Sequence, residues 1–69
     1  MDRYVVSKIF FNEVIEVKTK IFNSYEDAKT YYNLSILPYT LSDDYFVNRE
    51  GDYCLIDGVN KLEITLGLV

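Results

Sequence analysis

The first third of the chain alternates between apolar and polar positions in the manner of two β-strands. Residues 4–11 are rich in β-branched and aromatic side chains, a composition typical of strands. Residues 15–21 carry a β-branched side chain at every odd position and a charged one at every even position. A period of two predicts a strand with one solvated face. These two segments therefore predict a hairpin at the start of the chain.

The connection between these strands decides which side chains share a face. Asn12 and Glu13 are the predicted turn, because Asn tolerates a positive φ. A two-residue turn would set Phe10 opposite Ile15. It would leave four apolar side chains on the charged face of the hairpin: Val5, Ile9, Phe11 and Val14. We therefore expect another surface to cover that face.

A short helix is predicted to follow the hairpin. Ser24 can cap its first turn, and Asp27 three residues later completes a box-like pair that also suits the helix dipole. Asn33 is suited to the left-handed position that ends a helix. Leu37 precedes Pro38, which biases Leu37 toward extended geometry. We expect the helix to end near Asn33.

The second half of the chain again indicates strands. Two apolar runs, residues 45–47 and 53–56, flank a hairpin connection that contains Gly51. A turn at residues 58–60 leads to residues 62–68, where Leu or Ile occupies every even position. The element order is β-β-α-β-β-β. It predicts one small α+β domain over residues 1–69, an antiparallel sheet with one short helix packed on it.

The composition removes most catalytic and metal-binding chemistry. The 69 residues include no His and no Trp, one Cys, seven Tyr and four Phe. Without His, the usual zinc ligands and the usual general base are missing. Asp43 and Asp44 lack the further oxygen ligands and the closing Glu of a calcium loop. Cys54 lies in an apolar run with no base to form a thiolate, so we expect it to be buried and structural. We expect no enzymatic activity, no cofactor and no metal.

The charge is acidic and unevenly distributed. The net charge is −4, and residues 22–69 hold eight acidic but only three basic side chains. Because direct contact with nucleic acid needs clustered Lys and Arg, we expect none. One hypothesis from this imbalance is an acidic protein that imitates DNA and inhibits a host DNA-binding protein.

The expected location is the cytoplasm. The chain does not open with a basic segment followed by an apolar stretch, the pattern of a secretory signal. No apolar run approaches the roughly 18–20 residues that cross a membrane, so we expect no membrane association. A single Cys suits a reducing compartment.

Size and aromatic content favour self-association. A core this small rarely contributes more than about 3–5 kcal/mol of folding stability unless a disulfide, a bound metal or self-association adds to it. We expect a symmetric dimer that buries Val5, Ile9, Phe11 and Val14. Two alternatives remain: residues 62–68 pair edge to edge with a second copy, or the second hairpin wraps over the first within one chain. Two tyrosines add rigid area with a polar tip and are also expected at an interface: Tyr31 and Tyr39.

One segment resembles a known group of proteins. Residues 22–32, FNSYEDAKTYY, resemble the strand-to-helix segment of small uncharacterised proteins encoded by phages and prophages of Gram-positive bacteria. The resemblance implies no site residue. It implies a small non-enzymatic accessory protein that acts through protein–protein contacts, with a host protein as a partner.

Overall fold

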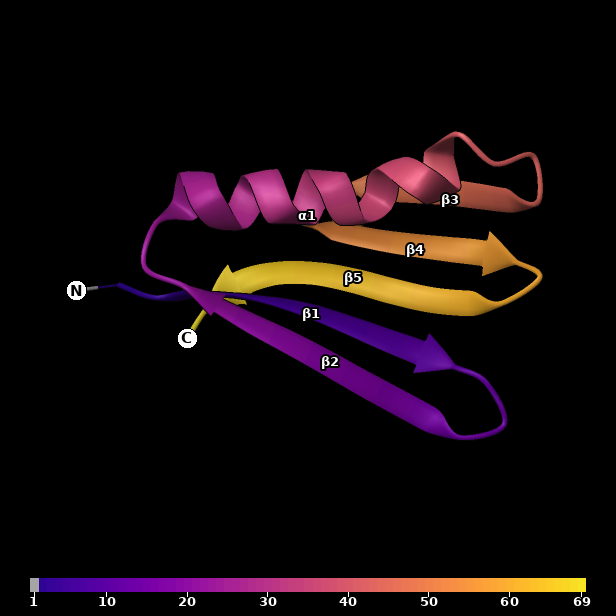
Figure 1. Ribbon diagram of the computed structural model, residues 1–69, viewed down its shortest axis with the longest axis horizontal. Helices are drawn as coiled ribbons and strands as arrows, with labels where there is room; N and C mark the ends of the chain where they lie inside the picture. The colour runs from indigo at the N-terminus through magenta and orange to yellow at the C-terminus, as the bar shows by residue number, and fades with distance from the viewer. Residues whose placement is uncertain (1) are drawn as a thin grey trace.

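A computed structural model describes residues 2–69, which form one five-stranded antiparallel sheet and one helix (Figure 1). In chain order the elements are β1 (Tyr4–Phe11), β2 (Ile15–Phe22), α1 (Tyr25–Thr40), β3 (Tyr45–Glu50), β4 (Tyr53–Gly58) and β5 (Lys61–Leu68). The predicted α+β order β-β-α-β-β-β is confirmed.

The strands lie in the order β2-β1-β5-β4-β3, which places the last strand at the centre of the sheet. β5 pairs with β1 on one side and with β4 on the other. Edge-to-edge pairing through residues 62–68 is therefore wrong, because both edges of β5 are already used. The second hairpin continues the same sheet, so the alternative in which it wraps over the first hairpin is also wrong. The edge strands are β2 and β3 (Figure 1).

The connection between β1 and β2 is one residue longer than predicted. Residues 12–14 separate the strands, and Phe11 pairs with Ile15. The two-residue turn is wrong, and a one-residue change of register moves every β2 side chain to the other face relative to β1. Six apolar side chains of the two strands consequently share the face opposite the core: Val5, Ile9, Phe11, Ile15, Val17 and Ile21.

The helix begins as predicted but is longer. Ser24 is the N-cap, and its hydroxyl accepts a hydrogen bond from the Asp27 backbone N–H. The predicted end near Asn33 is wrong, because α1 continues through Pro38 to Thr40. A proline inside a helix costs about 3 kcal/mol. Here the extra turns bury Ile36. Pro38 has no N–H to donate to the carbonyl four residues before it. Because Pro38 lies on the exposed side of the helix, water can donate to that carbonyl instead.

The hydrophobic core lies between α1 and one face of the sheet. The helix contributes a stripe with a spacing of four residues, and the sheet contributes mainly the even positions of β1, β4 and β5. The buried core residues are Val6, Ala28, Tyr32, Ile36, Cys54, Ile56, Leu62, Ile64 and Leu66. The prediction that Cys54 is buried is confirmed.

Two glycines are required by the turns of the second half. Gly51 has a φ of 59° in the β3–β4 turn, a conformation that is costly for residues with a side chain. Gly58 lies against the start of β3, where an added Cβ would collide with the Asp44 carbonyl oxygen and the Tyr45 side chain. Gly67, also in a strand, has no atom within 4 Å of the position where a Cβ would lie.

We predict that Gly58→Ala destabilises the protein while Gly67→Ala does not. The Gly58 variant must displace backbone atoms of β3, at a cost of about 1–3 kcal/mol. Urea unfolding followed by circular dichroism measures both variants. Equal unfolding free energies for the two would show that β3 does not pack closely on Gly58.

Candidate functional site

The sheet has one covered and one open face, and the open face is apolar over the β1–β2 hairpin. Helix α1 packs on the side of the buried core, so the alternate side chains of each strand point away from it. Figure 1 shows the hairpin extending away from α1 toward its loop end. We call the six side chains of this face the open-face patch: Val5, Ile9, Phe11, Ile15, Val17 and Ile21.

The open-face patch is exposed mainly along the edge strand. Ile15, Val17 and Ile21 are 64%, 58% and 55% exposed, whereas Val5 and Ile9 of β1 are half-buried. Ile15 and Val17 are neighbours on this face, and Thr19 separates them from Ile21. Together the three exposed side chains give the edge strand a mainly apolar face. Such surfaces on small proteins mark contacts with other molecules.

The remainder of the open face is mixed in character. There Phe46 and Leu55 alternate with charged and polar residues of β3, β4 and β5. The Tyr53 hydroxyl donates a hydrogen bond of 2.7 Å to the Glu63 carboxylate across β4 and β5. The apolar character is therefore concentrated on the β1–β2 half of the sheet.

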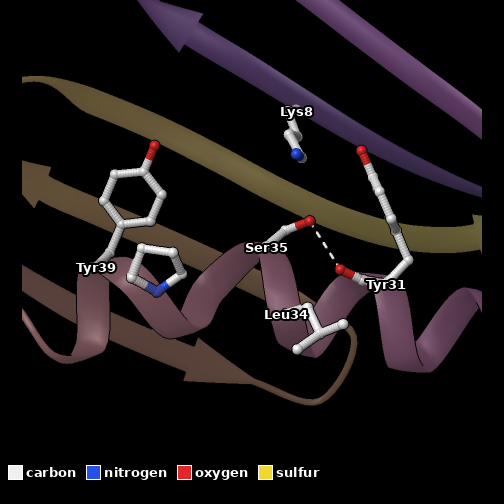
Figure 2. A pocket seen from close by; sticks show the side chains of 6 residues that line it. Lys8, Tyr31, Leu34, Ser35 and Tyr39 are labelled. Carbon is white, nitrogen blue, oxygen red and sulfur yellow. Dashed lines mark hydrogen bonds between the residues drawn. The ribbon is translucent and has the colours of Figure 1, made fainter.

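A second feature lies on the helix side, where a pocket of about 420 Å³ opens between β1 and the C-terminal half of α1 (Figure 2). Figure 2 shows two tyrosine side chains rising from α1 on either side of Lys8, while the Ser35 hydroxyl donates a 2.7 Å hydrogen bond to the Tyr31 carbonyl. The lining residues are Lys8, Tyr31, Leu34, Ser35, Pro38 and Tyr39.

Three lysines gather beside this pocket. Lys8 lies directly opposite Lys18 in the β1–β2 pair, and Lys20 follows on the same face of β2. Like charges directly opposite one another destabilise a sheet. Lys18 is partly compensated by Glu16 at 3.4 Å. The ammonium groups of Lys8 and Lys20 both approach the Tyr31 ring, at 4.8 and 5.0 Å from its centre. We call Lys8, Lys18 and Lys20 the lysine cluster.

Two members of the lysine cluster, Lys8 and Lys20, act on the Tyr31 hydroxyl. The interaction of the Lys8 ammonium with the Tyr31 hydroxyl, together with the positive charge of Lys20, lowers the pKa of that hydroxyl despite its partial desolvation. Nearby positive charge stabilises the anionic form of a phenol, so a lowered pKa indicates a positive electrostatic potential at its oxygen. The pocket rim is therefore positive on a protein whose net charge is −4.

The six predicted interface residues do not form one surface. The three from β1 belong to the open-face patch. Val14 lies in the loop at the end of the hairpin and is 77% exposed. Tyr31 and Tyr39 lie on the other side of the sheet, where they line the pocket. The structure thus divides the predicted interface into two separate surfaces.

Sequence reasoning missed the β2 half of the open-face patch and the whole lysine cluster. The alternation in residues 15–21 identified both faces of β2 correctly. Which face of β1 each of them joins depends on the length of the connecting loop, and the predicted length was one residue short. The same one-residue error in register hides the pairing of Lys8 with Lys18.

The other reactive side chains offer little chemistry. Among residues 2–69, no three His, Cys, Asp or Glu side chains come together as they would around a metal ion. Burial raises the pKa of the Cys54 thiol, and the nearby positive charge of Arg49 offsets this only partly. The thiol is therefore kept in its protonated, unreactive form.

Comparison with known proteins gives no functional information, so a functional proposal must be based on these surfaces. No protein-family model matches the chain, and no curated protein or solved structure shows significant similarity to it. The helix in residues 2–69 lacks the length and apolar character needed to cross a bilayer.

We predict that the free energy of unfolding falls at alkaline pH because of the buried thiol. The folded protein keeps Cys54 protonated at pH values where the unfolded chain, with a thiol pKa of about 8.5, has released the proton. The unfolded state is then favoured increasingly as pH rises above about 8.5. The raised pKa of Tyr32, caused by burial, acts in the same direction at higher pH.

Urea unfolding at neutral pH and at pH about 9.5 measures this effect, with Cys54→Ala as the comparison. The variant, which has no thiol to titrate, should lose less stability over this interval than the parent protein. Identical losses would show that the thiol is not desolvated. Slow labelling of the native protein by a thiol reagent, and fast labelling in denaturant, provides an independent check.

Proposed function

We propose that this is a small non-enzymatic binding protein that acts through protein–protein contacts, with the open-face patch as its contact surface. The observation that supports the proposal is the coincidence of three exposed β-branched side chains on the edge strand with the apolar residues of β1 behind them. We further propose that the first partner of this surface is a second copy of the chain. The patch would then be the face of a symmetric dimer.

Energetics favour covering this face. Full burial of a Val or Ile side chain contributes roughly 1.5–3 kcal/mol, and the open-face patch exposes three such side chains along β2 alone. A domain of 69 residues gains only a modest stability from its own core. Packing two copies face to face would give each sheet a second apolar layer, as in a β-sandwich. A two-fold axis requires only that the patch complements itself.

The charges on the edge strand favour packing by faces over pairing by edges. β2 carries Glu16, Lys18 and Lys20 along its helix side, and lysines on an edge strand are a common protection against pairing with another chain. β3, the other edge, ends in Arg49 and Glu50. The apolar face has no such protection.

A role as a phage-type accessory protein stays a prediction that rests on residues 22–32 alone. In such a role, a host protein would dock on the same open-face patch and compete with the second copy. The acidic DNA-mimic alternative also stays a prediction. The lysine cluster breaks up the acidic surface that such a mimic would need, so we favour the apolar contact.

We predict that the protein is a dimer at micromolar concentration and that Val17→Glu weakens it. Val17 lies in the middle of the exposed β2 row, and a buried Glu there would be costly. Leu34→Glu is a matched control, because Leu34 is 60% exposed and Val17 58%, but Leu34 lies on the helix. Sedimentation equilibrium should show a dimer affinity at least about tenfold weaker for Val17→Glu only. An 8.1 kDa monomer over the whole concentration range would contradict the dimer.

We also predict that a protein captured by this chain from a bacterial lysate is held through the open-face patch. Capture with the parent protein, Val17→Glu and Leu34→Glu, each with and without competing duplex DNA, separates the two hypotheses. Loss of the captured protein with Val17→Glu alone supports an apolar contact. Release by duplex DNA, with no effect of Val17→Glu, would support the DNA mimic instead.

A further inference from the structure

The pocket between β1 and α1 combines positive charge with apolar walls. Lys8 provides an ammonium group at its mouth, and Leu34 and Pro38 provide an apolar side. The rings of Tyr31 and Tyr39 flank the opening (Figure 2). A cavity with mainly apolar walls and a few convergent polar groups is the usual form of a small-molecule site.

The positive charge at this pocket is not balanced from within the protein. In the described part of the chain, Lys18 and Lys29 form ion pairs with carboxylates, whereas no carboxylate lies within ion-pair distance of Lys8 or Lys20. Both uncompensated ammonium groups approach the same ring, that of Tyr31. Two cations held near one another without a counterion are favourably placed for a dianion.

The hydroxyl groups indicate which side of the pocket would meet such an anion. The Ser35 hydroxyl already donates to the Tyr31 carbonyl, so it has no proton left for a ligand. Within residues 2–69, the Tyr39 hydroxyl has no hydrogen-bond partner, and its ring is fixed by edge-to-face packing on Tyr45 at 5.0 Å. Lys8 and Tyr39 are therefore the available donors in the lining. Lys20 lies outside the lining and adds its positive charge beside the Tyr31 ring.

We propose that this pocket binds a small phosphate monoester, with the phosphate at Lys8, where the charge of Lys20 beside the Tyr31 ring also attracts it, and with the organic group against Leu34, Pro38 and the tyrosine rings. The phosphate group carries close to two negative charges at neutral pH, which matches two uncompensated lysines. The Tyr39 hydroxyl donates to a phosphate oxygen. This site lies on the opposite side of the sheet from the open-face patch, so ligand binding can be tested independently of dimer formation.

Phenyl phosphate is the test ligand, with inorganic phosphate and benzoate as comparisons at constant ionic strength. Amide chemical shifts of the full chain in ¹⁵N-labelled form report binding. We expect saturable shifts at Lys8, Tyr31 and Tyr39, with phenyl phosphate binding more tightly than either comparison. Inorganic phosphate lacks the apolar group, and benzoate carries only one charge. Equal affinity for either comparison, or no saturable shift at the pocket, would overturn the proposal.

Variants assign the binding to named groups. Lys8→Gln should weaken phenyl phosphate binding about tenfold, the value of one charged hydrogen bond. Lys61→Gln is the matched control, because Lys61 is an exposed strand lysine on the open face, and should leave the affinity unchanged. Tyr39→Phe keeps the ring packing and removes only the hydroxyl, so it should weaken binding without altering the fold. Equal losses for Lys8→Gln and Lys61→Gln would show non-specific attraction and contradict the site.

Discussion

The pairing of Phe11 with Ile15 across a three-residue loop determines the character of both surfaces of this protein. Because side chains alternate along a strand, this register fixes which β2 residues accompany which β1 residues. It gathers six apolar side chains of the hairpin on the open face and places its three lysines on the helix side, beside Val6 and Phe10, which pack in or against the core. With the predicted register, the charged β2 side chains would lie on the same face as Val5, Ile9 and Phe11. The open-face patch and the lysine cluster are thus two consequences of one backbone connection.

The core explains why the open face is left uncovered. The chain has a single helix, and its buried stripe of Ala28, Tyr32 and Ile36 covers one side of the sheet. Polar contacts fix this helix to the β3–β4 hairpin, where the Lys29 ammonium pairs with the Asp52 carboxylate at 2.5 Å. The Tyr32 hydroxyl donates to the Gly51 carbonyl. These contacts keep α1 on one face of the sheet. No other element of residues 2–69 covers the opposite face of the β1–β2 hairpin.

Much of the fold could be predicted from the sequence, because local signals determine it. The alternation in residues 15–21, the Ser24 cap and the Gly51 turn each act over a few residues, and all three are found in the structure. The helix end was missed because burial of Ile36 outweighs the local preferences of Asn33 and Pro38. The composition of the two candidate surfaces was missed because register depends on loop length. Neither long-range packing nor a one-residue loop difference leaves a clear local pattern.

Contacts between copies test the central claim, that the register creates an apolar face on which the protein associates. A sample that mixes ¹³C-labelled with unlabelled chains allows isotope-filtered nuclear Overhauser spectra to detect only contacts between copies. We predict intermolecular contacts between the methyl groups of Ile15 or Val17 in one copy and the Phe11 ring of the other. A dimer whose intermolecular contacts come only from α1 or β3, or a sample with none, would contradict this account.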